Sequence, residues 1–188
     1  MALRQTDVCC VPGQIQMKRT SIVGILSIAM MTWSVMPQSA VSQQKSPKAQ
    51  LVGTWTLVSW DQRNVDGTTF QQFGASPKGI AFFDTGGHYI ITVMRSDRPK
   101  YAIDNFGQLA QATAEENKAT AQGTITYFGT YSVNEADGTI DIRVEASSFP
   151  NWNGTDLKRF FEVTEDQLKL TVRPPRGGSV DVLWKRTK

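Results

Sequence analysis

The sequence has few of the residues from which most catalytic and metal sites are built. Its 188 residues include two cysteines and one histidine. Both cysteines, Cys9 and Cys10, lie at the start of the chain, so the remainder can form no disulfide and offers no thiolate nucleophile. The single histidine, His88, cannot supply a multi-histidine metal cluster, and its place beside Gly86-Gly87 is typical of a polar residue at a strand end. We therefore assign no catalytic residue and expect no metal site and no cofactor, and the sequence leaves open whether the protein is an enzyme.

The sequence also lacks an apolar run of full membrane-spanning length. The apolar stretch at residues 21–36 has about 16 residues, whereas a membrane-spanning helix needs about 20. It follows Lys18-Arg19 and precedes small residues at Ala40 and Ser42. Basic residues, a short apolar centre and a small-residue end are the three parts of a secretory signal peptide.

This pattern predicts that residues 1–42 form a signal peptide, with Met17 as the natural start. We expect the protein to be exported, to a periplasm or out of the cell, and to keep no stable membrane insertion after cleavage. A retained membrane anchor is the alternative. Residues 43–50 are predicted to be a polar linker, and residues 51–188 are long enough for one domain with its own core.

Neither sign of charge is in large excess. The chain has 20 Lys and Arg residues and 17 Asp and Glu residues. Three of the basic residues and one of the acidic residues fall within residues 1–42, so the remaining part is nearly neutral. A neutral balance gives no reason to expect a nucleic-acid partner.

Turn-forming residues such as Asp66-Gly67 and Asp137-Gly138 divide the rest of the chain at regular intervals. Between them lie runs rich in β-branched and aromatic residues. Eight or nine strands joined mostly by short turns predict an all-β, up-and-down antiparallel barrel, because closure removes exposed sheet edges. A two-layer sandwich is the alternative. The expected strands are 51–61, 68–73, 78–84, 87–95, 124–134, 139–147, 156–164, 167–173 and 179–187.

One segment departs from the strand pattern. Thr113 and Glu116 form a capping box, and the Ala-rich stretch after them ends at Gly123, which predicts one short helix. Its face is only weakly apolar, so we expect it to cap an end of the barrel. The segment before it, residues 95–109, is long for a loop in a compact domain, and we predict that it forms the cavity entrance.

Alternation along two strands singles out one arginine. Arg159 shares a face with Leu157, Phe161 and Val163, so we predict that it points into the barrel. An unpaired buried guanidinium is costly, and its partner is expected to be a carboxylate of the preceding strand or a ligand. The carboxylates considered are Glu145 and Asp141. On that strand Ile140, Ile142, Val144 and Ala146 take one face, and Asp141, Arg143 and Glu145 take the other.

Several short motifs, in order along the chain, resemble those of the lipocalin-like domain family found in many bacterial and fungal proteins. The resemblance covers residues 50–187. The family often has a histidine near position 143, and this chain has Arg143, which argues against a histidine-based activity. The motifs are GTWTLVSW at 53–60, Lys78-Gly79-Ile80, Gly86-Gly87-His88-Tyr89, Arg98-Pro99, YFGTYSV at 127–133, SSFPNWNGTDLKR at 147–159 and Trp184-Lys185-Arg186.

The resemblance implies a plug at one end of the barrel. In lipocalins a Gly-x-Trp motif in the first strand places the indole across the closed end, and an arginine near the last strand lies over it. The corresponding residues here are Gly53, Trp55 and Arg186.

The resemblance also implies a function. We expect an exported protein that binds a small, mostly apolar molecule in the barrel. The alternatives are an isomerase or cyclase acting on a terpenoid-like substrate, and a structural or envelope module with a filled barrel. The predicted ligand-binding residues are Tyr89, Tyr127, Tyr131, Arg159 and Phe161, with Phe83 and Phe128 as further candidates for the aromatic wall.

Overall fold

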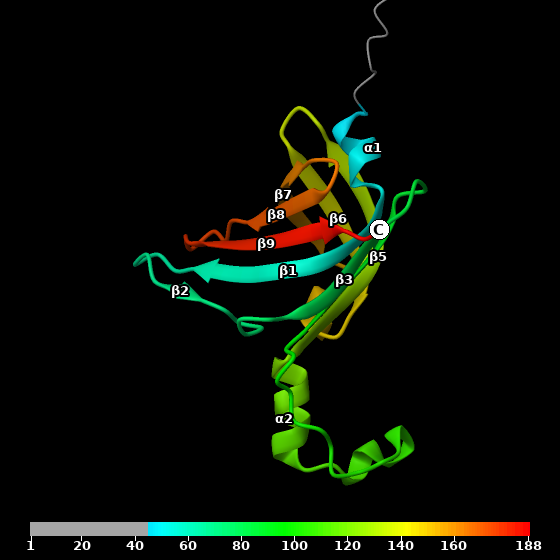
Figure 1. The fold of residues 1–188 in the computed structure, drawn as a ribbon, viewed down its shortest axis with the longest axis vertical. Helices are drawn as coiled ribbons and strands as arrows, with labels where there is room; N and C mark the ends of the chain where they lie inside the picture. Colours follow the sequence, from blue (N-terminus) through cyan, green and yellow to red (C-terminus); the bar gives the residue numbers. More distant parts are fainter. Residues whose placement is uncertain (1–44) are drawn as a thin grey trace, which may run out of the picture. The chain divides into compact units, whose positions relative to one another are not determined.

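The computed structural model describes residues 45–188, so the predicted signal peptide and both cysteines lie outside the described residues. Nine antiparallel strands form one sheet in the order β2-β1-β3-β4-β5-β6-β7-β8-β9, and β1 also pairs with β9 (Figure 1). The sheet thus closes into an eight-stranded barrel with β2 as an extra strand. The strands are β1 Gly53–Arg63, β2 Thr69–Phe70, β3 Lys78–Phe83, β4 His88–Met94, β5 Thr124–Asn134, β6 Thr139–Ser147, β7 Asp156–Val163, β8 Gln167–Val172 and β9 Ser179–Arg186.

The predicted up-and-down barrel is confirmed, and the sandwich alternative is wrong. Consecutive strands pair from β3 to β9, and the β1–β9 ladder joins Trp55 with Arg186 at one end and Arg63 with Ser179 at the other. Turn glycines adopt the positive φ values that tight hairpins need, for example +62° at Gly138 between β5 and β6.

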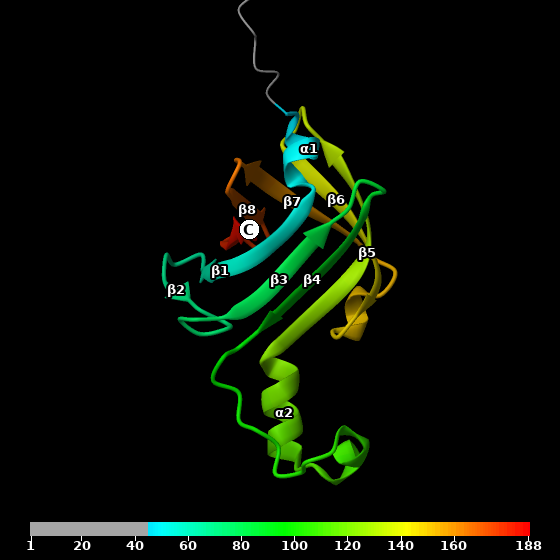
Figure 2. The same cartoon turned by 45° about the vertical axis from the view of Figure 1, so that its right-hand side comes forward.

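The predicted helix is present as α2, Ala114–Gln122. The hydroxyl of Thr113 accepts a hydrogen bond from the backbone N–H of Glu116, and the Glu116 carboxylate accepts one from the backbone N–H of Thr113. None of its residues is buried, and Figures 1 and 2 show it leading away from the barrel. The expectation that it covers the barrel end is therefore wrong, because its face has too little apolar surface to pack there. A short 3-10 helix, η1 Phe106–Gln111, precedes it.

The segment predicted as a linker is partly helical. Residues Pro47–Leu51 form α1, with Ser46 as its N-cap and Pro47 in its first turn. The helix ends with Leu51, which is fully buried in the core. An apolar anchor after a Ser-Pro start orders this segment, so the linker prediction is wrong from residue 47 onwards.

Two bulges set which side chains face the interior. A register shift between Leu57 and Ser59 brings Trp60 opposite Val182, a core residue. A second shift after Phe128 pairs that outward residue with Ala146, so the prediction that Ala146 shares the face of Val144 is wrong. A second 3-10 helix, η2 Pro150–Trp152, follows β6.

The second bulge requires a glycine. A Cβ atom on Gly129 would collide with the backbone carbonyl of Arg143 on the paired strand. The two backbones can approach so closely only without a side chain at this position.

Within residues 45–188, no helix is both long and apolar enough to cross a membrane.

Candidate functional site

One end of the barrel is closed by an indole under a guanidinium. The Arg186 guanidinium carbon lies 4.0 Å from the centroid of the Trp55 ring, which is fully buried. The Trp55 Nε1–H donates to the carbonyl of Leu51 at 2.9 Å, and Arg186 Nη1 donates to the carbonyl of Val52 at 3.0 Å. Arg186 therefore ties the last strand to the chain segment that enters the first, and stacks on Trp55 as it does so.

Gly53 makes room for this arrangement. Its φ is +136°, and a Cβ at this position would lie 2.7 Å from Arg186 Nη1. A larger residue would therefore strain the backbone and displace the guanidinium. These are the three residues that the family resemblance assigned to the plug.

A continuous aromatic wall lines part of the barrel interior. Ring centroids are separated by 6.3 Å between Phe83 and Tyr89, 5.8 Å between Tyr89 and Tyr127, and 5.3 Å between Tyr127 and Trp152. Tyr131 packs edge-on against Phe83 at 5.2 Å. The wall supplies a large apolar surface with few polar groups.

Arg159 faces the same interior. Its residue is 7% exposed, and β7 pairs it with Ile140, a fully buried residue of β6. Its Nη1 donates to the carbonyl of Lys158 at 3.0 Å. A guanidinium has five N–H donors, so one hydrogen bond to a carbonyl leaves most of its capacity unused.

The carboxylates considered as partners for Arg159 do not pair with it. Asp141 faces outward and lies 3.6 Å from Lys158 Nζ, and Glu145 is exposed. Alternation explains this outcome, because Asp141 pairs in register with Lys158 and both point to the opposite face from Arg159. Across the described part of the chain, no carboxylate lies within ion-pair distance of Arg159.

Two tyrosines share the electrostatic surroundings of Arg159. Burial raises the pKa of Tyr127, and the nearby charge of Arg159 partly opposes that rise. Burial, followed by the neighbouring Tyr127, also raises the pKa of Tyr89, and Arg159 again acts in the opposite direction. We call Tyr89, Tyr127 and Arg159 the interior donor cluster, because the phenols stay protonated at neutral pH.

Unpartnered polar atoms also face the interior. The buried hydroxyl of Tyr89 and the indole N–H groups of Trp60 and Trp184 find no hydrogen-bond partner among the described residues. A buried donor without a partner costs about 1–3 kcal/mol. Neither tryptophan is among the predicted site residues. Trp60 turns inward only through the bulge in β1, which alternation does not indicate.

The remaining predicted residues divide between the two faces. Phe161 is 8% exposed on the inner face, two positions from Arg159. Tyr131 is buried near the closed end, and its hydroxyl donates to the Asp84 carbonyl at 2.7 Å, so it is already engaged. Phe128, a further candidate for the aromatic wall, is 43% exposed on the outer face and does not belong to it. Its side chain points away from Tyr127, its neighbour in β5.

His88 lies outside the barrel interior. Its Nδ1 is 3.0 Å from the Asp84 carboxylate in the β3–β4 turn, where both are at least partly exposed. A hydrogen bond from the backbone N–H of His88 lowers the pKa of Asp84. No cluster of three or more potential metal ligands occurs in residues 45–188.

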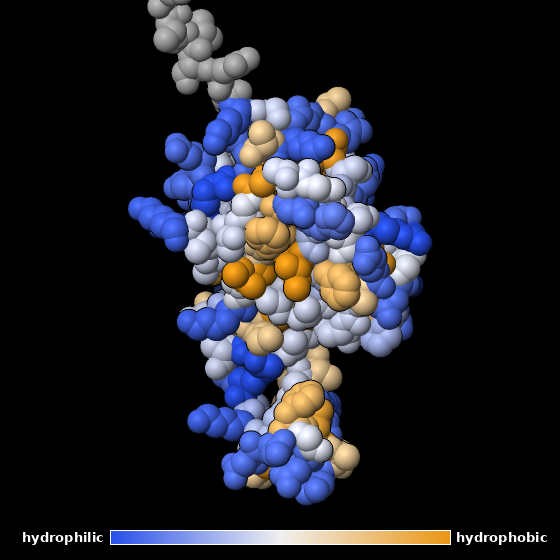
Figure 3. All heavy atoms as spheres, turned by 90° about the vertical axis from the view of Figure 1, so that its right-hand side faces the viewer, coloured by the Kyte–Doolittle hydropathy of each residue, from blue (hydrophilic) through white to orange (hydrophobic). Residues whose placement is uncertain are grey.

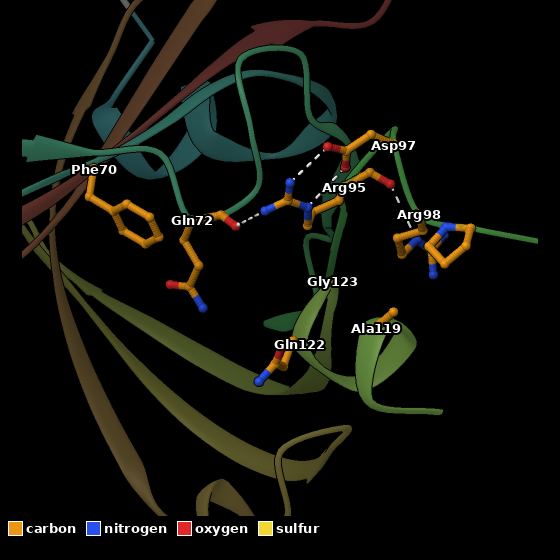
Figure 4. A pocket seen from close by; sticks show the side chains of 9 residues that line it. Phe70, Gln72, Arg95, Asp97, Arg98, Ala119, Gln122 and Gly123 are labelled. Atoms are coloured by element: carbon orange, nitrogen blue, oxygen red, sulfur yellow. Dashed lines mark hydrogen bonds and ion pairs between the residues drawn. The ribbon is translucent and has the colours of Figure 1, made fainter. Parts of the chain in front are cut away.

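The barrel end opposite Trp55 carries an open pocket of about 560 Å³. Arg95 lies in it between the carboxylate of Asp97, at 2.7 and 2.9 Å, and the carbonyl of Gln72 (Figure 4). Arg98 donates to the hydroxyl of Thr124 at 2.8 Å and packs where a Cβ on Gly123 would lie. The start of the predicted entrance segment, residues 95–109, thus lines this pocket.

Comparison with known proteins gives one family and two solved structures. The model of the family described as a lipocalin-like domain matches residues 52–187. A redesigned beta barrel is 15% identical, with a TM-score of 0.39, over 77% of this chain and 100% of its own. A de novo designed fluorescence-activating beta barrel is 13% identical, with a TM-score of 0.36, over 73% of this chain and 94% of its own. No curated protein matches the sequence.

Proposed function

Because the chain belongs to the lipocalin-like domain family, we propose that its barrel binds a small molecule with an anionic or acceptor-rich head and a mostly apolar body. The head meets the interior donor cluster, and the body lies along the aromatic wall. The fold by itself is consistent with small-molecule binding in general, so the finer proposal rests on the side chains of the interior.

The observation that carries the proposal is the buried guanidinium of Arg159 without a carboxylate partner. Burial of an unpaired charge costs several kcal/mol, so a protein retains one where a ligand of opposite charge compensates it. A carboxylate or sulfonate can accept two parallel hydrogen bonds from a guanidinium. An anionic head therefore suits Arg159 better than a hydroxyl does.

The tyrosines define the same head group. The Tyr89 hydroxyl lacks a partner, and Tyr127 lies close enough to Arg159 for the guanidinium to act on the pKa of its phenol. With their pKa values raised, both phenols remain neutral and can donate to a ligand oxygen. One cation and two hydroxyls that converge in this way favour an acceptor with several lone pairs.

The rest of the interior favours an apolar or aromatic body. The wall from Phe83 to Trp152 and the buried aliphatic residues around Phe161 offer almost no acceptors. No carboxylate or imidazole of residues 45–188 is buried with Arg159, so no observation specifically favours the isomerase or cyclase alternative.

A displacement assay tests the proposal. An anionic naphthalene sulfonate and a neutral naphthylamine of similar size are titrated into the wild type, Arg159→Leu and Arg143→Leu. Arg143 is the matched control, because it is an exposed arginine of the neighbouring strand, 3.1 Å from Asp156. We expect Arg159→Leu to weaken the anionic probe by about tenfold or more and the neutral probe little. Equal losses for both probes, or for both variants, would remove Arg159 from the site.

The protein is proposed to act after export, in a periplasm or outside the cell. Lys18-Arg19, the apolar stretch at residues 21–36 and the small residues at Ala40 and Ser42 support this proposal. The mature N-terminus should lie between residues 40 and 44. N-terminal sequencing of the extracytoplasmic fraction checks it, and a chain that still begins at residue 17 would refute cleavage.

A further inference from the structure

The outer wall of the barrel over β3, β4 and β5 carries a row of exposed apolar side chains. Phe82, Ile90 and Phe128 are 44%, 41% and 43% exposed. Phe82 pairs in register with Ile90, and Ile90 with Phe128, so the three lie next to one another across adjacent strands. Ile80, 45% exposed, extends the row along β3. We call these four residues the outer patch.

The outer patch is a contiguous surface and not a set of scattered residues. Figure 3 shows apolar atoms gathered in the middle of the barrel wall that faces the viewer. Single exposed apolar residues are ordinary, whereas contiguous apolar patches on a folded domain mark interaction sites.

The wall around the patch is nearly free of charge. Strands β3, β4 and β5 contain one lysine, one histidine and no carboxylate, and Lys78 and His88 are each the first residue of their strand. Beside the patch, the hydroxyls of Thr92 and Thr126 hydrogen-bond to each other at 2.6 Å. These hydroxyls keep a partner when water is removed, so the wall can be buried at little polar cost.

The opposite wall has a different character. Its outward positions alternate in charge and form ion pairs across the strands. These are Arg143 with Asp156 at 3.1 Å, Lys158 with Asp141 at 3.6 Å and Lys169 with Asp181 at 3.4 Å. The sequence therefore places ion-paired charge on β6 to β9, whereas the one lysine of β3 to β5, Lys78, lies at a strand end.

We propose that two copies of this chain associate through the outer patch, wall against wall, about a two-fold axis. Two such walls can meet without burying an unpaired charge, and each copy supplies the same wall. In a two-fold dimer the same surface of both copies forms the interface, so one outer patch on each copy is sufficient. Apolar residues at the centre and threonines around them give the composition of a homodimer interface. The partner is thus a second copy, in contrast to a charged protein or an anionic membrane.

The test uses the protein with whatever N-terminus its producing cells leave on it. The double variant Ile90→Thr/Phe128→Thr removes apolar area from the outer patch and keeps good strand formers at both positions. The matched control is Val65→Thr/Phe70→Thr, which removes two exposed apolar side chains, 77% and 53% exposed, elsewhere on the molecule. Sedimentation velocity over a range of concentrations gives the dissociation constant of each protein.

We expect the wild type and the control to form dimers, and the patch variant to raise the dissociation constant by at least about tenfold. Thermal unfolding establishes that the patch variant is folded. Added salt should leave the wild-type dimer unchanged or tighten it, because the interface is uncharged. A wild type that stays monomeric, a variant and control that dissociate alike, or a dimer weakened by salt would overturn the proposal. So would a monomeric wild type that uses the patch to bind neutral lipid vesicles.

Discussion

The guanidinium carbon of Arg186 lies 4.0 Å from the centroid of the Trp55 ring. In the sequence, the two residues stand near the beginning and the end of the barrel domain. The stack joins β9 to β1 at the closed end of the barrel. Removal of either side chain should therefore destabilise the closure itself.

The first prediction concerns this pair. Trp55→Ala should lower the free energy of unfolding by about 3–5 kcal/mol, because it removes a fully buried indole. Arg186→Ala should cost less. The double mutant should show a coupling of about 1–2 kcal/mol for a stacked, partly desolvated pair. Urea unfolding measures all three, and a cost below about 1 kcal/mol for Trp55→Ala would contradict its role as the plug.

The second prediction concerns Gly53. Its φ is +136°, and an added Cβ would meet Arg186 Nη1 at 2.7 Å, so Gly53→Ala combines backbone strain with displacement of the guanidinium. We expect a loss of about 2 kcal/mol or more. Gly74→Ala is the control, since Gly74 also has a positive φ, +77°, but has open space around it. Equal losses of unfolding free energy for the two variants would mean that the Arg186 guanidinium can move away from the added methyl group without destabilising the fold.

The third prediction is that Arg159→Leu does not destabilise the unliganded protein. The leucine replaces a buried charge that has no carboxylate partner within residues 45–188, so the free energy of unfolding should stay the same or rise by about 1 kcal/mol or more. The same variant is expected to bind anionic probes poorly. A loss of about 3 kcal/mol or more would indicate that Arg159 is paired inside the fold.

The fourth prediction concerns alkaline pH. Tyr127 has a pKa above its ordinary value of 10.0 in the barrel, so the folded state holds a proton that the unfolded state releases. Its contribution to stability is full below pH 10 and is lost as the pH rises towards the folded-state pKa, by up to about 1.4 kcal/mol per pH unit. Tyr127→Phe should reduce this loss, and Tyr101→Phe, which removes a phenol from the segment outside the barrel, is the control. Urea unfolding at successive pH values gives the slopes, and an unchanged slope for Tyr127→Phe would contradict the burial of that phenol.

Much of the fold could be predicted because its determinants are local. Turn residues such as Asp137-Gly138 and the period-2 pattern of strands fix each hairpin independently of the others. The capping box at Thr113 similarly fixes the start of α2. Position in space is less local, and the direction in which α2 leaves the barrel could not be read from its residues.

The interior was harder to predict because it depends on register. One bulge turns Trp60 inward, and another leaves Ala146 outward, opposite Phe128, although strict alternation gives no sign of either. The missing partner of Arg159 also follows from register, since Asp141 lies beside Lys158 on the other face. The sequence indicates that Arg159 shares a strand face with apolar residues. Which charged residues it can reach depends on the register between paired strands.

In the proposed function the barrel holds a small molecule with an anionic head at Arg159. Native mass spectrometry of the protein purified from its producing cells detects such a molecule without a choice of probe. We expect the wild type and Arg143→Leu to carry the same small acid with an apolar body, and Arg159→Leu to carry none of it. Retention of the same molecule by Arg159→Leu, or a molecule without an anionic group on the wild type, would contradict this function.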